Sequence, residues 1–146
     1  MKLLNLIYCD SLRQEINNKV TLVGCYSERL LITIAKENQW PINLPLAIYA
    51  RVERENGDGK IISCGVEISD AEGPLTSIEA PIQSGADQTR PMILGFGVQI
   101  PFRHAGPIKT QLMLRDEAGR KYLLEGPGGF ALETVIAEAT TPPSSQ

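Results

Sequence analysis

Apolar and polar residues alternate along most of the chain with a period of two. The run from 45 to 54 has its apolar positions at Leu46, Ile48, Ala50 and Val52. The run from 92 to 102 carries the longest apolar stripe, formed by Met92, Leu94, Phe96, Val98, Ile100 and Phe102. Successive side chains of a strand point to opposite faces, so this pattern predicts sheets with one dry face and one wetter face. No window of helical length shows an equally clear period of 3.6 residues.

Turn residues separate the alternating runs. The segment ENGDGK (55–60) contains Asn-Gly and Asp-Gly pairs, which tolerate positive φ, and is predicted to be the most secure hairpin turn of the chain. The segments SDAEGP (69–74) and RDEAGRK (115–121) also place an acidic residue before a glycine. Strands are predicted at 3–9, 19–26, 29–34, 45–54, 60–69, 75–83, 92–102 and 108–116, with a ninth near 121–124 or 130–135.

This arrangement of strands and turns predicts an all-β fold, an antiparallel two-sheet β-sandwich of immunoglobulin-like or C2-like style. We expect a single domain over 1–139 and a flexible C-terminal tail over 140–146. Ile61, Ile93 and Met113 lie opposite the main apolar stripes. Such residues sit beneath a loop or a partner subunit, which makes a homodimer a hypothesis.

Composition narrows the class of protein. The chain has 146 residues, 42% of them hydrophobic, and a net charge of −3, so no overall basic field attracts nucleic acid. The apolar run that follows Met1 stops at Asp10, too early for a signal peptide or a membrane span. Cys9, Cys25 and Cys64 are odd in number and widely spaced, which favours free thiols buried in strands and a reducing cytoplasm. The expected location is therefore cytoplasmic, without membrane or nucleic-acid partners.

Candidate chemistry is sparse. A cysteine nucleophile needs a base, and the only histidine is His104, in a turn. There is no C-x-x-C pair for zinc, whereas carboxylates pooled from several loops leave calcium open. The glycine-rich segment 124–133 lacks the lysine and hydroxyl of a phosphate-binding loop and is expected to be a turn or a strand-breaking kink before the last strand. The sequence therefore predicts no catalytic, metal or cofactor-binding residue and no cofactor, and we expect a protein that is not an enzyme.

The opening stretch YCDSLRQEINNKVTLVGCY (8–26) has two interpretations. Its charged residues Asp10, Arg13, Glu15 and Lys19 form ion pairs at the corner of a hairpin that turns at Asn17–Asn18, or Asp10 and Glu15 form an acid–base site with His104. The structural interpretation is favoured, because ion-paired strand ends are common and a catalytic carboxylate needs a second convergent group.

The same stretch resembles the N-terminus of a family of small uncharacterised bacterial proteins, a domain-of-unknown-function group. The positions that carry the resemblance are Asp10, Arg13, Glu15, Lys19, Leu22, Val23, Gly24 and Tyr26. The later run FRHAGPIKTQLMLRDEAG (102–119) is similar to the penultimate hairpin of such chains. The resemblance implies a bacterial, cytoplasmic β-sandwich and carries no activity, substrate or cofactor. Gly24 inside a strand predicts a bulge or a close backbone approach.

These observations predict a non-enzymatic binding or assembly module that recognises an unknown protein partner through loops or a sheet edge. The candidate interaction residues are Trp40, Asp87, Arg90, Arg103 and His104. Trp40 is either an exposed interface anchor or, as we favour, a cap on the core. The alternative is a sensor or sequestering protein for an anionic small molecule, bound by Arg90, Arg103 and Lys109.

Overall fold

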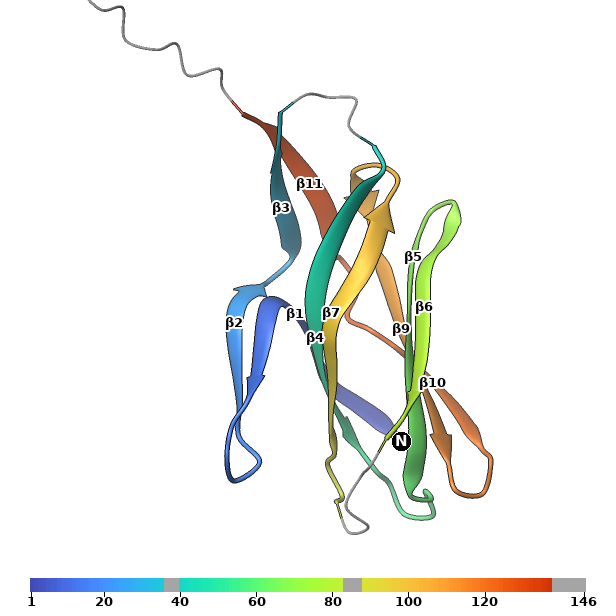
Figure 1. Ribbon diagram of the computed structural model, residues 1–146. Helices are drawn as coiled ribbons and strands as arrows, with labels where there is room; N and C mark the ends of the chain where they lie inside the picture. The colour runs from blue at the N-terminus through green and yellow to red at the C-terminus, as the bar shows by residue number, and fades with distance from the viewer. Residues whose placement is uncertain (36–39, 83–87, 138–146) are drawn as a thin grey trace, which may run out of the picture.

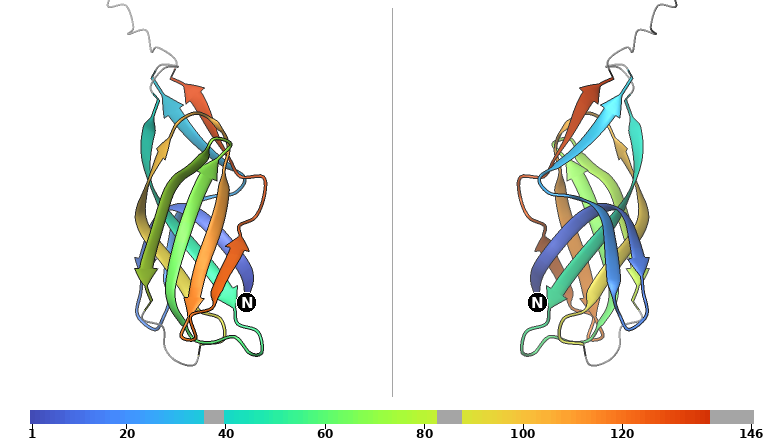
Figure 2. Two further views of the ribbon diagram at one scale, coloured as in Figure 1. Left: turned by 90° about the vertical axis from the view of Figure 1, so that its right-hand side faces the viewer. Right: turned by 90° about the vertical axis from the view of Figure 1, so that its left-hand side faces the viewer.

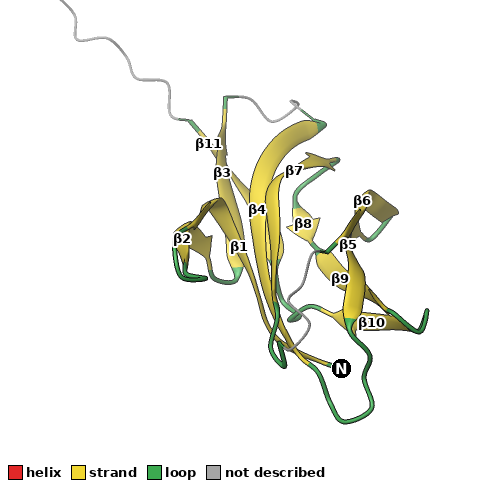
Figure 3. Ribbon diagram, turned by 60° about the horizontal axis from the view of Figure 1, so that its bottom comes forward, coloured by secondary structure: helices red, strands yellow, loops and turns green. Residues whose placement is uncertain are grey.

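The computed structural model describes residues 1–35, 40–82 and 88–137, and these residues are strands and loops without a helix (Figures 1 and 3). The strands are β1 (Lys2–Gln14), β2 (Val20–Tyr26), β3 (Arg29–Ile34), β4 (Ile42–Glu53), β5 (Ile61–Asp70), β6 (Gly73–Pro81), β7 (Met92–Phe102), β8 (Gly106–Pro107), β9 (Lys109–Asp116), β10 (Lys121–Glu125) and β11 (Ala131–Ile136). The all-β prediction is confirmed, and both positions proposed for a ninth strand are strands.

Two four-stranded antiparallel sheets, in the orders β2-β1-β4-β7 and β10-β9-β5-β6, pack face to face as a β-sandwich (Figure 2). A third sheet, of order β3-β11-β8, lies toward one end of the sandwich, and in it β3 and β11 run parallel. The sandwich matches the expected fold, and the small parallel pair was not expected. Whether the style is immunoglobulin-like or C2-like stays a prediction.

The core lies between the two large sheets. Its fully buried members include Val52, Ile68, Ile100, Phe102 and Leu112. The third sheet adds Leu30 and Leu132, which close one end of the core. Burial of such side chains is worth roughly 1.5–3 kcal/mol each, so the alternating pattern supplies the main drive for this fold.

Three predicted turns are confirmed as hairpins. SDAEGP joins β5 to β6, and RDEAGRK joins β9 to β10. The first hairpin joins β1 to β2 and turns at Asn17 and Asn18, whose φ angles of 62° and 55° are positive. Asparagine tolerates this left-handed region better than most residues, which explains its use here.

The turn expected to be the most secure hairpin is not a hairpin. β4 pairs with β1 and β7, whereas β5 pairs with β6 and β9, so ENGDGK crosses from one sheet to the other. The Asp58 carboxylate accepts the Glu55 N–H at 2.8 Å, and the buried Asp116 carboxylate accepts the Gly59 N–H at 3.3 Å. Local turn chemistry reverses the chain, but long-range packing decides which sheet the next strand joins.

The longest apolar stripe also changes face. The β4–β7 register shifts between Leu46 and Ile48, opposite a glycine, Gly97, whose φ is +57°. Val98 is therefore buried on one side of the irregularity and Ile93 on the other, while Phe96 is 57% exposed. A bulge moves a strand by one residue and so inverts its faces, which a strict period of two does not anticipate.

A second apolar cluster covers the outer face of the first sheet. β1 bends so that its second half and β2 lie on the side of β4 and β7 that faces away from the second sheet (Figures 1 and 2). The buried members of this second apolar cluster are Cys9, Leu12 and Ala47, and the residues packed against them are Val20, Leu22, Tyr49 and Leu94. The first hairpin therefore covers apolar residues on the outer face of the first sheet. Ile61 and Ile93, expected to lie opposite the main apolar stripes, belong instead to the main core.

Candidate functional site

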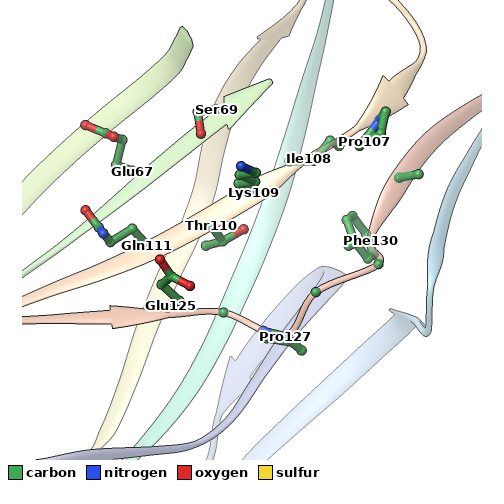
Figure 4. Close-up of a pocket in the computed structure, with 14 residues that line it drawn as sticks. Glu67, Ser69, Pro107, Ile108, Lys109, Thr110, Gln111, Glu125, Pro127 and Phe130 are labelled. Atoms are coloured by element: carbon green, nitrogen blue, oxygen red, sulfur yellow. The ribbon is translucent and has the colours of Figure 1, made fainter. Parts of the chain in front are cut away.

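The largest hollow that we describe lies on the outer face of the second sheet, and we call it the outer groove (Figure 4). It encloses about 460 Å³. Its polar lining comes from β5, β9 and β10, and its far wall is the segment from 126 to 131. The polar side chains are Glu67, Ser69, Lys109, Thr110, Gln111 and Glu125.

Alternation and register place these side chains together. Ile68 and Leu112 point into the core, so their neighbours Glu67 and Gln111 point outward. Gln111 is directly opposite Glu67 on β5 and Glu125 on β10. An amide therefore stands between two carboxylates that belong to strands about 10 Å apart. This row is the centre of the groove.

The wall of the groove is held firmly. The Gly126 N–H donates to the Thr110 carbonyl at 2.7 Å, and the Ile108 N–H donates to the Phe130 carbonyl at 2.9 Å. The Phe130 ring stacks on Tyr8 with a centroid distance of 4.6 Å. Gly129 has a φ of +86°, a conformation that favours glycine. The sequence predicted a turn or a kink here, and in the structure this segment forms the side of a cavity.

A smaller hollow of about 240 Å³ lies on the other side of the same segment, and we call it the inner hollow. It is lined by Tyr8, Tyr26 and Glu28 among others, and shares Thr110 and Phe130 with the outer groove. Burial raises the pKa of Tyr8 to about 12, although a hydrogen bond with the Thr110 hydroxyl opposes the shift. Burial and the hydrogen bond to Asp10 raise the pKa of Tyr26 to about 12 as well. Both tyrosines are therefore protonated near neutral pH.

The charges of the outer groove are uncompensated. Within residues 1–35, 40–82 and 88–137, Glu67, Lys109 and Glu125 form no ion pair. By contrast, both arginines that flank β7 are paired with carboxylates. Two glutamates against one lysine leave the groove with one excess negative charge. Such a site favours a ligand that brings hydrogen-bond donors or positive charge.

The arginines proposed from the sequence do not converge. Arg90 Nε donates to Glu53 at 2.7 Å before the start of β7, and Arg103 Nη2 donates to Asp70 at 2.6 Å after its end. An eleven-residue strand is about 35 Å long, so the two guanidinium groups lie far apart. Lys109 lines the outer groove without either of them.

Arg103 and His104 belong to a carboxylate network at the β5–β6 turn. Arg103 also donates to the Gly73 carbonyl at 3.0 Å, and His104 Nε2 lies 3.3 Å from Glu72 and 3.6 Å from Asp70. Burial raises the pKa of the Asp70 carboxyl, but hydrogen bonds from Arg103 and from the Glu72 N–H outweigh that effect and hold the pKa below its usual value. These residues line neither hollow, and the network ties the turn to the end of β7.

The two candidates from loops have different outcomes. Trp40 is half-buried and packs against the main core, which is the core-cap interpretation that the sequence favoured. The Trp40–Pro41 peptide bond is cis. Asp87 lies outside the residues that the structure describes.

The charged residues of the first hairpin are arranged differently from the expected ion pairs. Tyr26 donates to Asp10 and Thr21 donates to Glu15. In the part of the chain that the structure describes, Arg13 and Lys19 pair with neither carboxylate. Hydroxyl groups of β2 therefore stand where basic partners were expected.

A close approach at Gly24, one of the two interpretations, is confirmed, and the group that approaches is the Asp10 side chain. Gly24 has a φ of +65°, and a Cβ atom there would lie 2.0 Å from the Asp10 carboxylate.

The three thiols differ in burial more than the sequence predicted. Cys9 is buried and Cys64 half-buried, but Cys25, expected to be buried, is exposed.

Sequence reasoning missed Glu67, Gln111 and Glu125 as site residues. Their only signal was their place on the polar side of predicted strands, which describes any solvated residue. The pairing of β5 with β9, and not with β4, brings them into one row. The pattern along the chain contains no such pairing information.

Among the described residues, no group of three histidine, cysteine or carboxylate side chains is placed to hold a metal ion. The same residues include no helix long and apolar enough to cross a membrane.

Comparison with protein-family models, with curated proteins and with solved structures finds no match to this chain. The fold and the hollow thus define a β-sandwich with a polar groove on one outer face, and the resemblance to a domain-of-unknown-function group stays a prediction.

Proposed function

We propose that the protein is a non-enzymatic binding module whose outer groove takes an extended basic segment of a protein partner. The observation that carries the proposal is the row of Glu67, Gln111 and Glu125, two uncompensated carboxylates on either side of an amide. Carboxylates accept hydrogen bonds from lysine and arginine side chains, and the amide both donates and accepts.

The shape of the groove supports a segment rather than a buried small molecule. The floor is the outer face of a sheet whose strands β5 and β9 are paired on both sides, so side chains and not backbone groups do the recognising. The wall carries no side chain at Gly128 and Gly129, which leaves open space beside the floor. An anionic metabolite, the alternative from the sequence, gains no support from this geometry, because Arg90 and Arg103 are paired elsewhere and only Lys109 reaches the groove.

The test is a titration of isotope-labelled protein with an oligolysine peptide, followed by amide chemical shifts. We expect shifts at 67–69, 109–111 and 125–131, and weaker binding at higher salt. Glu67→Gln and Glu125→Gln should each weaken binding about two- to fivefold, because a solvated ion pair is worth about 0.4–1 kcal/mol.

Glu117→Gln is the matched control, since Glu117 is exposed at the β9–β10 turn and its loss changes the net charge equally. An equal effect of all three substitutions would mean general electrostatic attraction and would refute the groove. Binding of a short diamine as tightly as the peptide would refute the protein segment in favour of a small cation. Tighter binding of oligoglutamate would support the anionic alternative.

A further inference from the structure

The two cysteines of the first hairpin lie directly opposite one another. Cys9 on β1 is the antiparallel register partner of Cys25 on β2. Opposite residues of an antiparallel pair have Cα atoms about 4.5–5.5 Å apart and side chains on the same face. Disulfides form when the Cα atoms are about 4.4–6.8 Å apart, a range that includes the usual spacing of such a register pair.

The two thiols differ in access to solvent, which sets the order in which they react. Cys25 is exposed, whereas Cys9 is completely buried in the second apolar cluster, beside Ala47. Burial raises the pKa of the Cys9 thiol, and the nearby Cys25 and Asp10 raise it further. An oxidant in solution therefore meets Cys25 first, while Cys9 is protected from it.

We propose that Cys9 and Cys25 form a reversible, redox-active cross-strand disulfide that covalently joins β1 to β2. The oxidant is a low-molecular-weight disulfide. The Cys25 thiolate attacks one of its sulfurs, which forms a mixed disulfide and releases one thiolate. The Cys9 sulfur then attacks Cys25 Sγ and expels the second thiolate. The two thiolates that leave take up the two protons lost by the cysteines, and two electrons pass from the protein to the oxidant.

The position of the pair connects it to a cavity. The next register pair along the hairpin is Tyr8 with Tyr26, and both tyrosines line the inner hollow. Tyr26 also donates to Asp10, which lies one residue beyond Cys9. A covalent bond between the strands holds one side of the inner hollow in the paired arrangement. The dithiol lies on the first sheet and the outer groove on the second, so the proposal is independent of the proposed function.

The experiment exposes the full-length reduced protein to oxidised glutathione under native conditions, then alkylates free thiols in denaturant and maps them by mass spectrometry. We expect the loss of two of the three thiols, a 9–25 disulfide, no retained glutathione and an alkylated Cys64. Cys64→Ala should behave as the parent does. Cys9→Ala should stop at glutathione on Cys25, and Cys25→Ala should keep its thiols.

Two results would overturn the proposal. The first is a stable glutathione adduct on Cys25, or a Cys25-linked dimer, with Cys9 still reduced in the parent protein. The second is the same mixture of pairings in the native protein as in urea, because the fold would then select nothing. If Cys9→Ala does not fold, the parent and Cys25→Ala, altered only at an exposed residue, still decide between these outcomes.

Discussion

The close approach at Gly24 permits a quantitative test of how the first hairpin is built. Gly24 and Gly119 both have positive φ, +65° and +80°. A Cβ atom at Gly119 meets nothing within 4 Å, whereas at Gly24 it lies 2.0 Å from Asp10 Oδ2 and 2.7 Å from Cγ. Alanine at either position costs about 1–2 kcal/mol for the left-handed backbone, so the two substitutions differ only in the neighbour that must move.

The additional cost at Gly24 has two parts. Asp10 must leave its position, which costs about 0.5–1.5 kcal/mol in an unfavourable rotamer, and its hydrogen bond from Tyr26 is lost at about 1 kcal/mol. We therefore expect Gly24→Ala to lower the free energy of unfolding by about 1.5–2.5 kcal/mol more than Gly119→Ala does.

A double-mutant cycle with Asp10→Ala isolates this term. The substitution removes the atoms at 2.0 and 2.7 Å and leaves only Cβ, at 3.1 Å, so Gly24→Ala should then cost about as much as Gly119→Ala. The assay is urea unfolding with linear extrapolation. A coupling energy within the additivity error of about 0.5 kcal/mol would show that Asp10 and Gly24 are not in contact and would refute the reasoning.

Further predictions follow from the core and from the carboxylate network. Phe102→Ala should lower the free energy of unfolding by about 3–5 kcal/mol, whereas Phe96→Ala, on the exposed side of the bulge, should change it by less than about 0.5 kcal/mol; equal effects in urea unfolding would place the bulge elsewhere. The pKa of Asp70 is lower folded than unfolded, so its stabilising contribution is complete above its ordinary pKa of 3.8 and is lost as the pH falls through the folded value. Arg103→Met should therefore flatten the dependence of stability on pH below about 4, as followed by acid titration of the urea midpoint.

Particular residues show how far the sequence determined this protein. The alternation of Leu46 to Val52 and the acid-before-glycine turns at 69–74 and 115–121 predicted strands and hairpins, because strand periodicity and turn chemistry are local properties. Trp40 as a core cap follows the same logic, since a large aromatic residue beside apolar strands is usually buried.

The tertiary structure decided the features that depend on pairing. The turn at 55–60 crosses between sheets, the bulge at Gly97 turns Phe96 outward, and the first hairpin folds over Cys9. The outer groove also arises from register, which joins residues that are distant in the chain. An alternating strand pattern specifies which side chains share a face, whereas the neighbours of that face are chosen by the packing of the whole chain.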